Sequence, residues 1–101
     1  MQFVVTAMDY TDADALDRRM AQRELHLAGV KRLVENGHFI SGGAILDEAG
    51  KMVGSTLHLE FPDRATLDAV LQSDPYVAGK VWEHIEVRQV RLVPVAMFKS
   101  G

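Results

Sequence analysis

The chain has 101 residues, with 48% apolar and 25% charged side chains, a composition typical of one folded domain over residues 1–101 and not of a disordered chain. Its net charge of −3 argues against nucleic-acid binding, because phosphate contacts need a concentrated basic face. The absence of cysteine excludes disulfides, thiol nucleophiles and thiolate metal sites.

The sequence does not predict a targeting or membrane segment. The apolar run at residues 1–8 lacks the basic start of a signal peptide and ends at Asp9. Every apolar stretch is shorter than the ~18 residues that a membrane-spanning helix needs. We therefore expect a cytoplasmic protein that does not bind a membrane.

A strand and then a long helix are predicted in the first third of the chain. Residues 2–8 are β-branched and aromatic at their centre, which favours a strand. Residues 12–36 are predicted to form a helix, with Thr11 and Asp14 at the spacing of a capping box and Asn36-Gly37 at the end. At about 100° per residue, one stripe of this helix is predicted to be buried; it contains Leu16, Met20, Leu27, Val30 and Val34.

The rest of the chain predicts three more strands and a short helix. Strands are expected over 38–46, interrupted by Gly42-Gly43, and over 52–61, with a turn at 48–51 between them. A helix follows Pro62-Asp63 and ends at Asp74-Pro75, because a residue before proline avoids the helical region. Residues 84–98 read as one long extended segment in which Pro94 favours an edge or a bulge.

This β-α-β-β-α-β order predicts an α+β, ferredoxin-like fold. Two helices cover one face of a four-stranded antiparallel sheet, and the other face, with Thr56 and His58, is left open. A second copy of the chain is the natural cover, so we expect a homodimer that forms through the open sheet face.

The long helix carries a cation and an imidazole near its apolar stripe. Arg23 and His26 are three residues apart, which makes them neighbours on one side of the helix. One interpretation is a functional site, because such groups are costly inside a domain unless they are paired. The other is that Arg23 bends to solvent and His26 is a satisfied, half-buried histidine.

Asp74 follows the second helix, where Pro75 fixes the backbone. Because both helices lie on one sheet face, Asp74 can approach His26 and orient its ring. Alternatively, Asp74 only caps a turn, which is common for Asp-Pro.

The segment Ser41-Gly42-Gly43 is a candidate ligand-binding element. Its glycines suggest either a simple bend or a place where a ligand approaches free backbone N–H groups. Ser41 with His26 and Asp74 suggests Ser-His-Asp hydrolysis, but no nucleophile elbow surrounds Ser41. His84 is expected to line a pocket with Tyr76, and no metal-binding spacing of histidines occurs.

Taken together, these motifs resemble those of the YciI-like (YCII-related) family of small dimeric α/β-barrel proteins. The matching segments run in order along nearly the whole chain: Arg23-Glu24-Leu25-His26-Leu27, Glu35-Asn36-Gly37, Ser41-Gly42-Gly43, Gly54-Ser55-Thr56, Asp74-Pro75-Tyr76-Val77-Ala78-Gly79 and Trp82-Glu83-His84-Ile85-Glu86-Val87. The resemblance implies a pocket with a His–Asp pair, here His26 and Asp74, and a fold like that of muconolactone isomerase. A dehydrochlorinase of a chlorinated hydroxyquinol is among the few family members with an assigned reaction. The short turn at 47–51 departs from members that carry a longer insertion there.

Three functions fit these residues. The first is a cofactor-independent lyase or isomerase that acts on a small acidic or phenolic substrate, with His26 as general base and Asp74 orienting it. Arg23 and the backbone at Gly42-Gly43 bind the substrate oxygen in this hypothesis. The second is a non-catalytic protein that binds a small metabolite in the same pocket, and the third is a phosphoryl carrier through His26.

Overall fold

The computed structural model describes residues 1–99 and contains the predicted β-α-β-β-α-β order with two additional short helices. The elements are β1 (Gln2–Asp9), α1 (Ala15–Glu35), β2 (Phe39–Leu46), β3 (Met52–Glu60), α2 (Arg64–Gln72), α3 (Pro75–Ala78), β4 (Trp82–Val90) and a 3-10 helix, η1 (Val95–Phe98).

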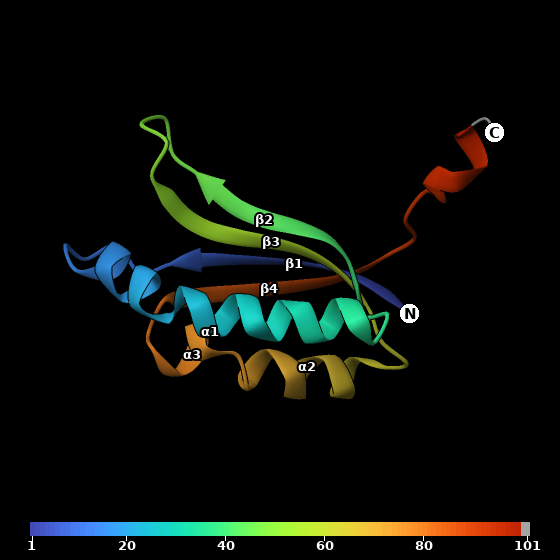
Figure 1. Cartoon of the computed structure of the whole chain (residues 1–101), viewed down its shortest axis with the longest axis horizontal. Coiled ribbons are helices and arrows are strands. Elements are labelled where there is room, and N and C mark those ends of the chain that lie inside the picture. Colours follow the sequence, from blue (N-terminus) through green and yellow to red (C-terminus); the bar gives the residue numbers. More distant parts are fainter. Residues whose placement is uncertain (100–101) are drawn as a thin grey trace.

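The four strands form one antiparallel sheet in the order β2-β3-β1-β4. All three α-helices lie on the same face of this sheet, and the opposite face is uncovered (Figure 1). The α+β, ferredoxin-like prediction is therefore confirmed. No helix in residues 1–99 is both long and apolar enough to cross a membrane.

The core lies between the sheet and the helices. Alternate residues of β1, from Phe3 to Asp9, and of β3, from Ser55 to Leu59, point toward the helices and are buried, as the two-residue period of a strand requires. Leu67 and Leu71, one turn apart on α2, pack against these side chains. The remaining members of the core are Phe3, Val5, Ala7, Leu57, Leu59, Phe61, Tyr76, Val81 and Trp82.

The predicted start and buried stripe of the first helix are wrong. The helix begins at Ala15, with Asp14 at the N-cap position in place of Thr11 and without a side-chain cap. Its buried residues are Ala15, Arg19 and His26, whereas half or more of Met20 and Val34 is exposed. The helix is thus rotated relative to the prediction, because polar side chains anchor it to the sheet, as described below.

The local signals at the ends of the helices are confirmed. Gly37 follows α1 with a φ of 76°, which a residue with a side chain rarely adopts. The Asp63 carboxylate accepts a hydrogen bond from the Thr66 N–H at 2.7 Å and caps α2.

The predicted extended segment 84–98 is also wrong in its limits. β4 begins at Trp82 and ends at Val90, where its pairing with β1 stops. Beyond Leu92 the described chain leaves the sheet and forms η1 at one extremity of the molecule (Figure 1).

Replacing a core leucine of α2 tests this packing. Leu67 is fully buried, so Leu67→Ala is expected to lower the free energy of unfolding by about 2–5 kcal/mol in urea denaturation. Leu25→Ala is the matched control, because Leu25 is 62% exposed on α1 and its loss should change stability by only about 0.5 kcal/mol. Equal losses for the two variants would contradict the assigned core.

Candidate functional site

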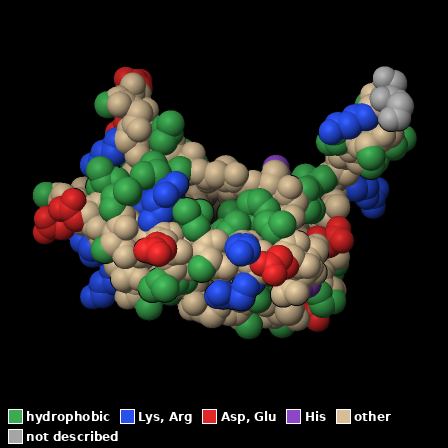
Figure 2. Space-filling model, in the orientation of Figure 1, with side chains coloured by type: hydrophobic (Ala, Val, Ile, Leu, Met, Phe, Trp, Pro, Cys, Tyr) green, Lys and Arg blue, Asp and Glu red, His purple; other side chains and the backbone are tan. Residues whose placement is uncertain are grey.

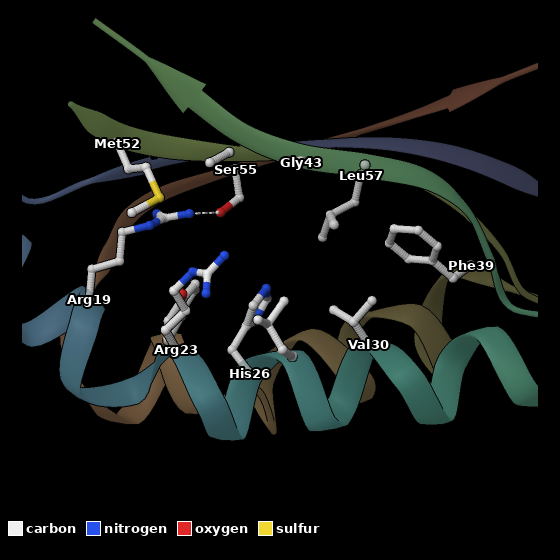
Figure 3. Close-up of a pocket in the computed structure, with 13 residues that line it drawn as sticks. Arg19, Arg23, His26, Val30, Phe39, Gly43, Met52, Ser55 and Leu57 are labelled. Atoms are coloured by element: carbon white, nitrogen blue, oxygen red, sulfur yellow. Dashed lines mark hydrogen bonds between the residues drawn. The ribbon is translucent and has the colours of Figure 1, made fainter. Parts of the chain in front are cut away.

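A cavity of about 160 Å³ lies between α1 and the β2–β3 part of the sheet (Figure 3). Side chains of α1 form one wall, and β2 and β3 form the other. The lining residues are Arg19, Arg23, His26, Leu27, Val30, Phe39, Gly42, Gly43, Ala44, Met52, Ser55, Leu57 and Tyr76.

His26, which lines this cavity, contacts Asp74, which does not line it. The His26 Nδ1 lies 2.9 Å from both carboxylate oxygens of Asp74. Asp74 Oδ1 also accepts the Tyr76 backbone N–H at 2.9 Å, so the same carboxylate caps α3. Both sequence interpretations of Asp74 therefore describe the structure, since it caps a turn and also contacts the imidazole.

This contact fixes the tautomer of the neutral imidazole. A carboxylate only accepts hydrogen bonds, so the proton of the ring must lie on Nδ1 of His26. The other nitrogen, Nε2, is then a hydrogen-bond acceptor. In Figure 3 the ring points from α1 into the cavity, which leaves Nε2 as the group available to a ligand.

Two aromatic side chains hold the imidazole ring. Tyr76 stacks on His26 with ring centroids 4.0 Å apart, and Trp82 meets the edge of the ring at 5.7 Å. Tyr76 is 1% exposed, and this burial raises its pKa above the ordinary value, although the nearby charges of Arg19 and Arg23 oppose the rise. Tyr76 is therefore neutral at physiological pH and serves as a fixed platform for His26.

Arg19 is a site residue that the sequence analysis missed. Its guanidinium is buried and donates from Nη1 to both oxygens of Asp9 at 2.9 Å and from Nη2 to the Ser55 hydroxyl at 2.9 Å. Trp82 Nε1 donates to the same hydroxyl at 3.1 Å. Burial raises the pKa of Asp9, and the hydrogen bond and charge of Arg19 oppose this rise.

A spacing in the sequence could have identified Arg19. It precedes Arg23 by four residues and His26 by seven, and these intervals place all three on one side of a helix. The three side chains do line one cavity.

Arg23 differs from Arg19 in having neither an ion pair nor a hydrogen bond with any of residues 1–99. Its side chain extends from α1 toward the cavity beside His26 (Figure 3). The interpretation that it bends away to solvent along its stem is only half right, because it is exposed and yet lines the cavity.

Gly42 brings the backbone of β2 close to its neighbours. A Cβ atom there would lie 2.7 Å from the carbonyl oxygen of Thr56 and 2.9 Å from a methyl group of Leu57, so only glycine fits. The strand register shifts between Phe39 and Ser41, which places the irregularity just before the glycines. Gly42 and Gly43 both line the cavity, as the ligand-binding interpretation requires.

Ser41 and His84 do not lie at this cavity, contrary to expectation. The Ser41 hydroxyl lies 2.9 Å from His58 Nδ1, and Ser41 pairs with His58 on the open sheet face. His84 pairs with Met8 on that same face, and its side chain is 79% exposed. The Ser-His-Asp arrangement is therefore wrong, and so is a pocket shared by His84 and Tyr76. Within residues 1–99, no three acidic, histidine or cysteine side chains are grouped so as to hold a metal ion.

Comparison with known proteins gives the family. The profile of the YCII-related domain matches residues 1–91. The chain belongs to the YCII-related family. Protein YciI of Escherichia coli O6:H1 is 33% identical over 99 residues, which cover 92% of this chain and 99% of the relative. An uncharacterized protein of Haemophilus influenzae is 32% identical over 100 residues, with the same coverage of both chains.

A solved structure supports the fold. The 5-chloro-2-hydroxyhydroquinone dehydrochlorinase of Burkholderia phenoliruptrix AC1100, in complex with 2,5-dihydroxybenzoquinone, aligns with a TM-score of 0.78. The alignment covers 90% of this chain and 94% of that chain, at 21% sequence identity. This likeness shows that the YCII-related chain and the dehydrochlorinase share one fold.

The buried ion pair predicts a large loss of stability on removal of its carboxylate. Asp9→Asn leaves the Arg19 charge without a counterion and is expected to cost about 3–5 kcal/mol in urea denaturation. Asp12→Asn is the matched control, because Asp12 pairs with Arg18 at the surface and its loss should change little. A small effect of Asp9→Asn would contradict the structural role given to Arg19.

Proposed function

We propose that the protein is a cofactor-independent enzyme of lyase or isomerase type, in which His26 is the general base and Asp74 orients it. The observation that carries this proposal is the contact of Nδ1 with both Asp74 oxygens at 2.9 Å, on a ring that lines a cavity. Nε2 accepts a proton from the substrate, and the positive charge that forms on the imidazole is stabilised by the carboxylate.

The cavity suits a small ring compound. Its volume of about 160 Å³ is close to the ~150 Å³ of an apolar cavity that holds benzene. Apolar side chains such as Leu27, Val30 and Leu57 would contact the ring, while the polar groups lie at the His26 end. A structural relative was solved with 2,5-dihydroxybenzoquinone, and we propose that small acidic or phenolic rings are the substrate class here as well.

Arg23 supplies the group that stabilises the substrate anion. Removal of a proton leaves negative charge on a substrate oxygen, and the Arg23 guanidinium, which has no counterion in the described part of the chain, attracts that charge. The backbone at Gly42 and Gly43 lines the opposite wall, and in this proposal it is the second group that contacts the same oxygen. Arg19 has no such role, because Asp9 neutralises it.

We also propose that two copies associate through the open sheet face. The helices cover one face only (Figure 1), and the other carries side chains such as Val4, Thr6 and His58 without any cover from residues 1–99. A second copy is the simplest way to remove this face from water.

The first test is turnover of a trial substrate. Release of chloride from 5-chloro-2-hydroxyhydroquinone would be followed for the wild type, His26→Gln and Arg23→Gln. His26→Gln is expected to lower kcat by about 10²–10⁴-fold, because it removes the base and retains a polar side chain. Arg23→Gln is expected to weaken both binding and turnover.

The control is His84→Gln, which changes an exposed histidine of the open face and should leave turnover intact. NMR titration with 2,5-dihydroxybenzoquinone, observed at the Gly42 and Gly43 amides, measures binding separately. Saturable binding without any product from a panel of acidic rings would favour the metabolite-binding alternative. A gain of one phosphoryl group on His26 would favour the phosphoryl carrier.

The orienting role of Asp74 has its own prediction. In the wild type, ¹⁵N NMR of the neutral His26 ring is expected to show the proton on Nδ1, whereas Asp74→Asn should give a mixture of tautomers and a lower kcat. Asp68→Asn is the matched control, since Asp68 pairs with Arg64 on the surface of α2, far from the cavity lining. An unchanged tautomer in Asp74→Asn would show that the carboxylate does not orient the ring.

A further inference from the structure

The Ser55 hydroxyl is a buried group whose two acceptor positions are both occupied. Ser55 lies on β3, is 2% exposed and lines the cavity (Figure 2 shows the whole surface in outline). Its Oγ accepts one hydrogen bond from Arg19 Nη2 at 2.9 Å and one from Trp82 Nε1 at 3.1 Å. A guanidinium and an indole N–H only donate, so these two bonds use both lone pairs of the hydroxyl oxygen.

The hydrogen of this hydroxyl is left without an acceptor. Ser55 Oγ donates no hydrogen bond to any of residues 1–99. Because donors occupy two of the directions around the oxygen, the O–H bond points in the one that remains. Figure 3 shows the hydroxyl on the sheet side of the cavity, directed into the space between β3 and α1. Buried donors are normally paired, so this hydrogen requires an acceptor that enters the cavity.

Donors outnumber acceptors at this end of the cavity. The Nε of Arg19 is also buried and has no hydrogen-bond partner in residues 1–99. The lining side chains around Ser55 on the sheet are those of Ala44, Met52 and Leu57, which are apolar and offer no strong acceptor. A ligand that binds here must therefore bring its own acceptor.

The charge of Arg19 strengthens Ser55 as a donor. A hydroxyl that accepts hydrogen bonds is polarised by them and donates more strongly in turn. Arg19 itself is paired with Asp9, so it acts on a ligand through Ser55 and is a positioning residue. Trp82 has the same role, because its N–H occupies the other lone pair.

We infer that the Ser55 hydroxyl donates a hydrogen bond to a second oxygen of the substrate, on the cavity wall opposite Arg23 and His26. Ser55 belongs to β3 and the other two residues to α1 (Figure 3), so the substrate carries oxygen on two sides of its ring. Because both lone pairs of the hydroxyl are occupied, Ser55 accepts no hydrogen bond from a ligand. It thus selects a carbonyl or phenolate oxygen and disfavours an amino group. This inference rests on the proposed function and specifies its substrate class.

The first experiment compares the binding of two ring compounds by isothermal titration calorimetry of the full chain. Both are anions at neutral pH, but 2,5-dihydroxybenzoquinone carries oxygen on both sides of its ring, whereas pentafluorophenol has a single oxygen. Ser55→Ala is expected to raise the Kd of the quinone about 10–100-fold and to leave that of pentafluorophenol nearly unchanged. Ser41→Ala is the matched control, because its exposed hydroxyl lies outside the cavity and its loss should change neither Kd.

The possible failures of this experiment differ from one another. Equal losses for both compounds in Ser55→Ala would show that Ser55 only anchors Arg19, and would overturn the inference. An unchanged Kd of the quinone would show that the hydroxyl does not contact the ligand, and would overturn it as well. If neither compound binds the wild type, the proposed substrate class itself is wrong, and the inference falls with it.

A second experiment uses the wild type alone, so it does not depend on the folding of a variant. Trp82 is the single tryptophan of the chain and does not line the cavity, so one indole N–H signal in NMR reports on the Ser55 hydroxyl. The quinone is expected to move this signal downfield, because a hydroxyl that donates becomes a stronger acceptor, and pentafluorophenol should move it much less. Equal responses to the two compounds, or no response to the bound quinone, would contradict the hydrogen bond from Ser55.

Discussion

The buried guanidinium of Arg19 is the constraint on which the site depends. A charge that is taken out of water must be matched, and Arg19 is matched by Asp9 on β1 and by Ser55 on β3. Because these partners lie on adjacent strands, the rotation of α1 about its own axis is fixed. His26 follows Arg19 by seven residues, which is nearly two full turns, so both residues face the same way. The ion pair thereby sets the direction in which the imidazole enters the cavity.

The turn between α2 and α3 provides a second anchor for the His26 ring. Asp74 is held by the Tyr76 N–H at the start of α3, and Pro75 limits the backbone between them. Tyr76 in turn stacks on the ring that Asp74 contacts. His26 is therefore fixed from two directions, through its own helix and through the turn at Asp74 and Pro75, and such support is what the proposed role of a general base requires.

The sequence was sufficient for topology because the topology is encoded locally. Alternation in β3 and the end signals at Gly37 and Asp63 each depend on a few neighbouring residues. The buried face of α1 was not predictable in this way. An apolar stripe normally marks the side of a helix that is removed from water. In α1, however, Leu27 and Val30 line a cavity, and the buried side contains Arg19. An analysis of hydrophobic periodicity treats every arginine as a surface residue. Arg19 is recognised as buried only from its hydrogen bonds to Asp9 and Ser55 on the sheet.

The errors at Ser41 and His84 share another physical cause. Successive side chains of a strand point to opposite faces of the sheet. One inserted residue or register shift therefore moves every following side chain to the other face. The register shifts before Ser41 and again between Met8 and Asp9, opposite the start of β4. The sequence left contact between His26 and Asp74 open beside a capping role for Asp74, and the structure has both. Neither residue lies on a strand, so no register error could separate them.

Arg19 and Arg23 of α1 show how the same side chain takes opposite roles about one turn apart. The charge of Arg19 is neutralised by Asp9, so Arg19 stabilises the position of α1 and contributes little electrostatic potential to the cavity. Arg23 has no counterion among residues 1–99, and its charge acts on whatever enters. If Arg19 and Arg23 both had a counterion, the cavity would favour neutral rings. If neither had one, α1 would lose the ion pair that anchors it to the sheet. The proposed preference for an anionic ligand therefore rests on the placement of one carboxylate, Asp9, beside Arg19 and not beside Arg23.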